Sequence, residues 1–249
     1  MKVSIITVTF NSARTLHDTL NSVLKQTYMD IEHIIIDGAS KDDTLKIVRE
    51  FSHISKIISE PDKGIYDAMN KGIQLASGDV IGILNSDDVF STEIIISEIA
   101  QIFKENEDID AVYGNICYFK TGEENKAVRF WQSKPYYKNF FENGEIPPHP
   151  SLFVRKKVYD DIGLYKPHYK IAADHEFMLR MLKIHKYKSF YLDKTIVKMR
   201  EGGVSTSGFG SYITSTKELI QVWKENNMKY PKRLFVLRPL KKIKQLIFK

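Results

Sequence analysis

The first half of the chain alternates unbroken apolar runs with segments in which apolar residues recur every three or four positions. Unbroken runs are typical of strands buried on both faces of a parallel sheet, and the three-to-four spacing is typical of amphipathic helices. The alternation predicts an α/β fold with a doubly wound, Rossmann-like, mostly parallel sheet flanked by helices. The expected strands are 3–10, 31–37, 56–59 and 80–84, and the expected helices are 11–26, 40–51, 65–76 and 92–106.

Helix starts are predicted from side chains that can cap free backbone N–H groups. Asn11 or Ser12 is expected to cap the first helix, and Ser40 with Asp43 forms a pair that resembles a capping box for the second.

The second half of the chain is less regular. The stretch 121–150, with its charges, aromatic residues and prolines, is predicted to be a loop. We expect one domain over residues 1–230, in which 111–230 completes a site that begins in 1–110. The expected strands are 111–119, 151–154 and 188–197, and the expected helices are 156–162, 173–185 and 212–226.

Composition excludes several classes of protein. Of the 249 residues, 43% are apolar and 27% are charged, as in an ordinary globular protein, so the chain is not expected to be disordered. Cys117 is the only cysteine, so no intrachain disulfide can form. No apolar run approaches the ~20 residues of a membrane-spanning helix, and the apolar start is predicted to be a strand and not a signal peptide.

The formal charge of +6 is concentrated at one end. Residues 231–249 contain seven Lys and Arg and no acidic residue, so the rest of the chain has a net charge of −1. A final helix is predicted to start at Pro239, with Leu240, Ile243 and Ile247 on one face. Such a basic amphipathic tail favours a membrane surface as partner over nucleic acid. The alternative is a helix that docks on its own domain or pairs in a dimer.

The candidate chemistry lies at the carboxyl ends of the predicted strands, where ligands bind in open α/β sheets. Asp37 ends one strand, and Asp87 and Asp88 follow another. Crowded carboxylates repel each other unless a cation or hydrogen-bond donors compensate. The segment 85–88 is therefore predicted to bind Mn²⁺ or Mg²⁺, or a ribose, although an Asp-rich turn before a helix is the alternative.

Several motifs occur in a fixed order along this half of the chain. They are VSIITVTFN at 3–11, IIIDGAS at 34–40, EPDKGIYDAMNKGI at 60–73, ASGD at 76–79 and LNSDD at 84–88. Together they resemble the family 2 glycosyltransferases, which have the GT-A fold, use nucleotide-sugars and invert the anomeric centre. The resemblance extends to about residue 205, and the likeness is greatest to bacterial enzymes of exopolysaccharide or O-antigen synthesis.

The resemblance implies a role for each matching residue on the donor side. Ser86 departs from a strict Asp-X-Asp metal motif, so the number of carboxylate ligands stays open. The implied nucleotide-sugar ligands are Thr9, Asn11 and Asp37 at the nucleoside, Asp62, Lys63 and Asn70 along the nucleotide side of the cleft, Asp87 near the ribose, and Asp88 at the metal.

The second half supplies the acceptor side. Asp174 matches the position of the general base, and Glu176 is the second candidate. His149 matches a position that faces the donor or acceptor sugar, and Arg200 with 202–205 resembles a loop that closes over the diphosphate. Each has a structural alternative, because Asp174 can cap its helix and His149 can be a loop residue among prolines.

The expected function is metal-assisted transfer of one sugar from a nucleotide-sugar, with a UDP-sugar the expected donor. The acceptor is a lipid-linked or oligosaccharide hydroxyl in bacterial surface polysaccharide synthesis, and the location is cytoplasmic, at the inner face of the plasma membrane. No Gln-X-X-Arg-Trp motif of processive synthases is present, which favours a single addition. The alternatives are a sugar nucleotidyltransferase, although 7–12 lacks a basic phosphate loop, and a non-catalytic membrane-recruited binding module.

Overall fold

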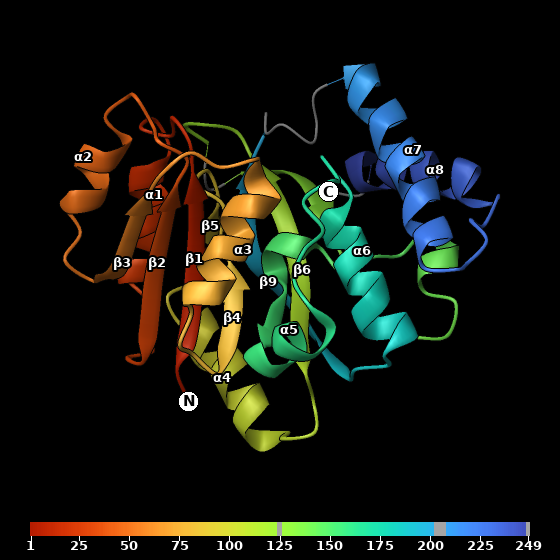
Figure 1. Ribbon diagram of the computed structural model, residues 1–249, viewed down its shortest axis with the longest axis horizontal. Coiled ribbons are helices and arrows are strands. Elements are labelled where there is room, and N and C mark those ends of the chain that lie inside the picture. The colour runs from red at the N-terminus through yellow and green to blue at the C-terminus, as the bar shows by residue number, and fades with distance from the viewer. Residues whose placement is uncertain (124–125, 202–207, 248–249) are drawn as a thin grey trace.

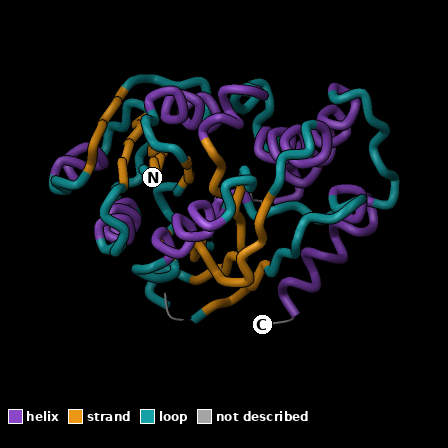
Figure 2. Tube along the Cα trace, turned by 90° about the horizontal axis from the view of Figure 1, so that it is seen from below, coloured by secondary structure: helices purple, strands orange, loops and turns teal. Residues whose placement is uncertain are grey.

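The computed structural model of the chain describes residues 1–123, 126–201 and 208–247. One mixed sheet of nine strands runs through the described part of the molecule, with helices on both of its sides (Figures 1 and 2). The strand order is β3-β2-β1-β4-β8-β6-β9-β5, and β7 pairs with β6 beside this path.

The first half forms the parallel part of the sheet, as predicted. All seven residues of β1 are buried, which is the physical reason for its unbroken apolar run. Helices join these strands and cover the sheet on its two faces. The elements are β1 (Val3–Thr9), α1 (Leu16–Leu24), β2 (Ile31–Asp37), α2 (Thr44–Arg49), β3 (Ile54–Ser59), α3 (Ile65–Leu75), β4 (Val80–Ile83) and α4 (Ile95–Glu105).

The second half makes the sheet mixed. β8 (Phe153–Arg155) lies antiparallel between β4 and β6 (Ala111–Phe119), and β9 (Ser189–Arg200) runs parallel to β6. The contact between β4 and β8 is close, because a Cβ at Gly82 would lie 2.4 Å from the ring of Phe153. The helical elements here are α5 (Lys156–Ile162), α6 (Ala173–Leu179) with a following π-turn (Arg180–Ile184), α7 (Gly208–Glu225), and the short turns Phe141–Asn143 and His149–Ser151.

Two strands were not predicted. β7 (Ala127–Trp131) pairs antiparallel with β6, so the prediction of a loop over 121–150 was wrong for this segment. β5 (Val89–Phe90) pairs antiparallel with β9 and brings the residues after β4 next to the end of β9.

The predicted caps were also wrong. α1 begins at Leu16, and the carbonyl of Ser12, not its side chain, accepts the backbone N–H groups of Thr15 and Leu16. Asp43 precedes α2 without a capping hydrogen bond, and the hydroxyl of Ser40 donates to Asp37 instead.

The last helix, α8 (Leu234–Ile247), begins five residues before the predicted start, and Pro239 lies inside it. Its first turn is part of the folded body, since Leu234 is only 2% exposed within the large apolar cluster that includes Trp223. None of the helices in the described ranges is long and apolar enough to cross a membrane.

Candidate functional site

The carboxyl ends of the parallel strands meet at one edge of the sheet, as predicted. Thr9 at the end of β1 is paired with Asp37 at the end of β2, and Asp37 is paired with Ser59 at the end of β3. The hydroxyl oxygen of Thr9 is buried and has no hydrogen-bond partner among the described residues.

Asp37 is fully buried and organises the loop above it. Its carboxylate accepts hydrogen bonds from Ser40 N (3.0 Å), Ser40 Oγ (2.5 Å) and Ser59 Oγ (2.7 Å). Ser40 Oγ in turn accepts the backbone N–H of Asn11, whose own Oδ1 accepts the N–H of Lys41 at 2.9 Å. A carboxylate offers about four acceptor positions, so one is left for a donor on a ligand.

Asp62 lies against the end of β2. A Cβ at Gly38 would be 2.5 Å from Asp62 Oδ2, so only glycine leaves room for this carboxylate. The other oxygen, Oδ1, accepts the N–H of Gly64 at 2.8 Å, and the neighbouring Lys63 is exposed.

Asn70 is engaged elsewhere. Its Nδ2 donates to the carbonyl of Tyr165 at 2.8 Å, and its Oδ1 accepts the N–H of Tyr165 at 3.0 Å. The amide therefore joins α3 to the segment before α6.

Asp87 and Asp88 follow β4 at the same edge. Asp88 is fully buried; its Oδ2 accepts Asn85 Nδ2 at 3.1 Å, its Oδ1 has no side-chain partner among the described residues, and the backbone N–H of Arg200 also faces the carboxylate. Burial and the neighbouring charge of Asp87 raise the pKa of Asp88 well above its usual range. Burial also raises the pKa of Asp87, against the opposing charge of Arg200. In both cases burial outweighs the neighbouring positive charge of Arg200, so the uncharged form is favoured.

These oxygens fit a divalent cation. Ser86 points away, with its hydroxyl 2.8 Å from that of Ser12, so the carboxylates of Asp87 and Asp88 are the available charged ligands. Within the described ranges there is no group of three or more His, Cys, Asp and Glu side chains that could hold a metal. Two carboxylates suit a Mg²⁺ or Mn²⁺ ion whose remaining ligands are substrate phosphates and water.

Arg200 lies at the end of β9, beside this acidic pair. The pairing of Val89 with Lys198 brings the end of β9 next to Asp88. The guanidinium of Arg200 donates to Asp18 Oδ2 at 2.9 Å and to Thr121 Oγ1 at 3.1 Å. Residues 202–205, which were predicted to form the closing loop, lie outside the described residues.

Asp174 lies in the first turn of α6. Its Oδ1 accepts the N–H of His175 at 2.7 Å and lies 3.4 Å from the hydroxyl of Tyr66, which shares its proton with the carbonyl of Ile171 at 2.7 Å. Burial raises the pKa of Asp174, and the charge of His149 is the largest opposing effect. Burial lowers the pKa of His149, whose Nε2 is 2.9 Å from the hydroxyl of Tyr165, and the Asp174 charge opposes that shift. Asp174 and His149 are therefore close neighbours.

A cavity of about 770 Å³ opens in front of Asp174. It is lined by the start of α6, by β7 and by α8, and it reaches Tyr118 on β6. Burial raises the pKa of Tyr118, the Arg129 charge opposes the shift, and the Asp88 charge adds to it. Tyr118 thus links the cavity of Asp174 to the surroundings of Asp88.

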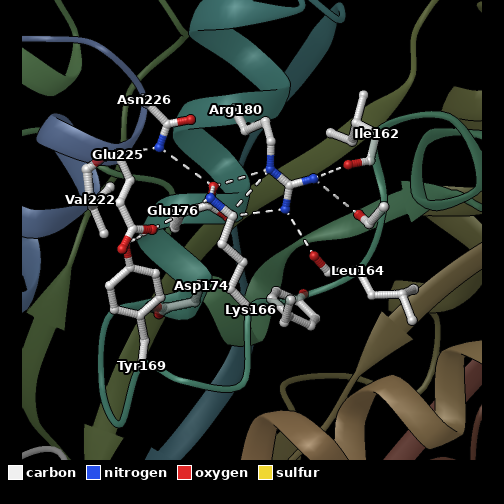
Figure 3. Close-up of polar contacts among 12 residues, drawn as sticks. Ile162, Leu164, Lys166, Tyr169, Asp174, Glu176, Arg180, Val222, Glu225 and Asn226 are labelled. Atoms are coloured by element: carbon white, nitrogen blue, oxygen red, sulfur yellow. Dashed lines mark hydrogen bonds and ion pairs between the residues drawn. The ribbon is translucent and has the colours of Figure 1, made fainter.

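Glu176 is in a different environment, although it is two residues from Asp174. It is fully buried, and Figure 3 shows Arg180, Lys166 and Asn226 converging on it. Its oxygens are 3.0 Å from Arg180 Nη2 and 2.9 Å from Lys166 Nζ, and Asn226 Nδ2 donates at 3.4 Å. Both oxygens are occupied, so Glu176 is a structural ion-pair partner and does not face the cavity.

Three aromatic and basic residues near the site were missed from the sequence. Tyr66, which contacts Asp174, lies within the motif at 60–73 and could have been found there. Arg129, whose guanidinium is 4.4 Å from the ring of Tyr118, and Arg238 of α8 lie in segments whose structure was not predicted correctly.

Comparisons with known proteins agree with this geometry. The model of the Glycosyl transferase family 2 matches residues 4–186. A "PGL/p-HBAD biosynthesis glycosyltransferase" of Mycobacterium bovis is 30% identical over 209 residues, which cover 82% of this chain and 79% of the relative. An Escherichia coli relative, "UDP-Glc:alpha-D-GlcNAc-diphosphoundecaprenol beta-1,3-glucosyltransferase WfgD", is 37% identical over 115 residues, which are 45% of each chain.

Solved structures share the fold. S. aureus TarS in complex with UDP-GlcNAc has a TM-score of 0.66 at 20% identity, covering 89% of this chain and 66% of that one. A longer TarS chain is matched over 39% of its length and 90% of this chain, with a TM-score of 0.65 and 18% identity. The mannosyltransferase PcManGT from Pyrobaculum calidifontis, in complex with GDP-Man and Mn²⁺, has a TM-score of 0.66 at 15% identity, covering 95% of this chain and 68% of that one.

The sheet order, the acidic strand ends and the motifs are thus those of the GT-A fold, and the fold prediction is confirmed. The family match covers well over half of the chain. The chain belongs to the family 2 glycosyltransferases.

Proposed function

We propose that the chain is a metal-assisted, inverting glycosyltransferase. It moves one sugar from a nucleotide-sugar, with a UDP-sugar as donor, to a hydroxyl of a lipid-linked acceptor in bacterial surface polysaccharide synthesis. The observation that carries the proposal is the buried acidic pair Asp87 and Asp88 at the sheet edge, within electrostatic range of Tyr118, which lines the cavity of Asp174. The printed names of the E. coli relative and the TarS complex support the donor class and the acceptor class.

The nucleoside is assigned to the edge formed by β1 and β2. Asp37 has one acceptor position left for an N–H of the base, and the unpartnered hydroxyl of Thr9 lies beside it. Asn11 shapes the loop through Ser40, Asp62 lies against Gly38, and Lys63 is exposed at the same edge, where its ammonium group can meet a phosphate.

Asp87 and Asp88 would hold the divalent ion. When bound, the ion supplies positive charge that stabilises the leaving diphosphate. Asp88 offers its buried carboxylate, and ionisation of the pair becomes favourable once a cation is present, which is the reverse of the raised pKa in its absence. The Mn²⁺ in the PcManGT complex supports this assignment.

Asp174 is proposed as the general base. In a single in-line displacement the acceptor oxygen bonds to the anomeric carbon while the bond to the diphosphate oxygen breaks. The acceptor proton passes to the carboxylate of Asp174, which must be ionised to accept it. Asp174 faces the cavity, whereas Glu176 is bound to Arg180 and Lys166.

A membrane surface is the proposed location. The outer side of α8 exposes Phe235, Val236 and Leu240, and seven basic residues lie in 231–249. Apolar side chains with surrounding positive charge suit the anionic cytoplasmic leaflet of a plasma membrane, where a lipid-linked acceptor is found.

The test is a screen of UDP-, GDP- and dTDP-sugars for metal-dependent hydrolysis and transfer, with Asp88→Asn, Asp174→Asn and the control Asp108→Asn. Asp108 is an exposed acid paired with Lys188, so its substitution makes the same chemical change away from the site. We expect Asp88→Asn to lose metal-dependent donor binding. Asp174→Asn should keep donor binding and lose transfer by about 10²–10⁴-fold.

Other outcomes would reject the proposal. Full transfer by Asp174→Asn would remove the base assignment. Release of pyrophosphate from a nucleoside triphosphate and a sugar phosphate would indicate a nucleotidyltransferase, and binding without any turnover would indicate a non-catalytic module.

A further inference from the structure

One part of β9 leaves the regular ladder of the sheet beside the cavity of Asp174. β6 and β9 pair in register up to Gly114 and Leu192, and the register shifts at the next residue of β6, so Asp193 and Lys194 form a β-bulge. A Cβ at Gly114 would lie 2.7 Å from the carbonyl oxygen of Lys194, so glycine is what lets the bulge lie this close to β6. Bulges redirect side chains beside active sites, and Asp193 lines the same cavity as Asp174.

The side chain of Asp193 is held through one of its two oxygens. Asn115 Nδ2 donates to Asp193 Oδ1 at 3.0 Å, and Gln132 Nε2 donates to the same oxygen at 3.5 Å. The hydroxyl of Tyr191 shares its proton between Asp193 Oδ1 at 2.8 Å and Asn115 Oδ1 at 2.9 Å. Asn115 is itself fixed, because its Oδ1 accepts the backbone N–H of Ser133 at 2.8 Å. The carboxylate is therefore oriented before any ligand arrives.

The other oxygen of Asp193, Oδ2, is left for a ligand. In the part of the chain that the structure describes, the donors to Asp193 all reach Oδ1, and no cation forms an ion pair with it. Hydrogen bonds from Tyr191 and Asn115 hold the pKa of Asp193 below its usual value, so the carboxylate is ionised at neutral pH. Hydrogen bonds to an ionised acceptor are roughly twice as strong as those between neutral groups.

The charges of the cavity nearly balance. Burial lowers the pKa of His175 to about 3, so this lining residue is neutral. The ring of Phe130, 39% exposed, adds an apolar surface to the lining. Balanced charge, an apolar surface and an oriented acceptor oxygen suit an uncharged molecule with hydroxyl groups better than an ion. The charged residues among those described in the lining are Glu145, Asp174 and Asp193 against Arg129, Lys134, Arg238 and Lys241.

We propose that Asp193 is a specificity-determining residue, which accepts a hydrogen bond from one hydroxyl of an uncharged acceptor sugar while another hydroxyl of that acceptor meets Asp174. The inference rests on the proposed function and adds the residue that reads the acceptor. A cavity of about 770 Å³ has room for a sugar between the two carboxylates. A site that hydrogen-bonds a substrate hydroxyl discriminates against the analogue that lacks it.

The experiment measures binding of propyl glycosides to the full chain by saturation-transfer NMR titration. The probes are the propyl glycosides of glucose, galactose, mannose and N-acetylglucosamine, and then the monodeoxy analogues of the one that binds tightest. UDP and Mg²⁺ are present at saturation, so that the probes do not enter the proposed donor edge. The variant is Asp193→Asn, and the matched control is Asp108→Asn, which makes the same change at an exposed residue that does not line the cavity.

We expect Asp193→Asn to weaken binding of the tightest glycoside by about tenfold to a hundredfold, because a hydrogen bond to a charged acceptor is lost. The control should bind like the parent chain. One monodeoxy analogue should bind the parent chain more weakly by a similar factor and should bind the parent and Asp193→Asn equally, since the hydroxyl that Asp193 reads is already absent. A purely structural effect of the substitution would weaken binding of every analogue alike.

Three results would overturn the inference: unchanged affinity in Asp193→Asn, an equal loss for the glycoside and all of its deoxy analogues, or no binding of any glycoside to the parent chain. Failure of the proposed function is distinguishable from these, because it would appear as absent sugar transfer while the binding difference between the parent chain and Asp193→Asn remained.

Discussion

At the scale of single residues, Asp174 and Glu176 differ in their partners and not in their chemistry. Both carboxylates lie in the first turns of α6. Asp174 accepts hydrogen bonds from one backbone amide and one tyrosine, while Glu176 is paired with Arg180 and Lys166. A buried carboxylate that neutralises two cations is needed for folding, whereas one beside a cavity is available for proton transfer.

The contrast predicts different effects on stability for two substitutions that each replace a carboxylate with an uncharged amide. Glu176→Gln should lower the free energy of unfolding by about 3 kcal/mol, because it leaves Arg180 and Lys166 without their carboxylate. Asp174→Asn should keep the stability of the parent chain. Urea denaturation followed by circular dichroism measures both, and a Glu176→Gln variant that is as stable as the parent would contradict the role assigned to Glu176.

The pKa of Asp174 predicts a pH dependence. Since burial raises this pKa, kcat/KM should fall as the pH is lowered. The midpoint of that fall should lie above the usual pKa range of a carboxyl group. The hydroxyl of Tyr66 stabilises the ionised form, so Tyr66→Phe should raise the pKa further and move this acid limb to higher pH. Pre-steady-state rates between pH 4 and 8 measure the limb. A limb that stays in place, or moves to lower pH, would argue against Asp174 as the group that titrates.

The locations of site residues were predictable only where sequence position fixes spatial position. The ends of parallel strands must share an edge, so Thr9, Asp37 and Asp88 were found from the strand pattern. Asn70 and Tyr66 depend on Tyr165 and Asp174, about a hundred positions away, and no local pattern reports such contacts.

At the scale of elements, strands buried on both faces were predictable and marginal strands were not. β1 has an unbroken buried pattern, whereas β7 is half-exposed along most of its length and β5 has two residues. β7 pairs with the preceding strand β6, whereas β5 is held by β9, about a hundred residues further along the chain. α8 was misplaced because Pro239 favours a helix start, while the burial of Leu234 made the earlier turn stable.

The exposed side of α8 predicts membrane binding. Val236→Ser with Leu240→Ser should reduce flotation with phosphatidylglycerol vesicles by about tenfold or more, because it removes apolar area that would enter the interface. The matched control is Met29→Ser with Ile94→Ser, which removes equally exposed apolar side chains elsewhere on the surface. Equal loss in both variants, or no loss in either, would mean that α8 is not the membrane contact.

At the scale of the whole molecule, buried histidines make stability depend on pH. Burial lowers the pKa of His33, which stacks on His53, to about 3, and lowers that of His175 to about 3. Since the unfolded chain takes up these protons near pH 6.5 and the folded chain does not, acidification favours unfolding. The pKa of Glu32 is about 2 in the fold, so its contribution is lost in turn below pH 4.5.

Urea unfolding at pH 7, 6 and 5 should therefore give a stability that falls by up to about 1.4 kcal/mol per pH unit for each such histidine. The His33→Gln variant cannot take up this proton, so its stability should fall less steeply with decreasing pH than that of the parent chain. The control His185→Gln, a substitution on the surface, should keep the slope of the parent chain. Parallel slopes for the parent chain and His33→Gln would show that His33 does not titrate on unfolding.

The position of β8 has a consequence for how the molecule is made. Among the parallel strands of residues 1–110, β4 lies at one edge, and its partner on that side is β8. During synthesis β8 becomes available only when Phe153–Arg155 leaves the ribosome. Until then β4 is an apolar strand whose backbone N–H and C=O groups are unpaired on one side, and it can pair with strands of other nascent chains. Residues 1–110 are therefore not an independent unit of biosynthesis, because the strand that covers β4 comes from the second half of the chain.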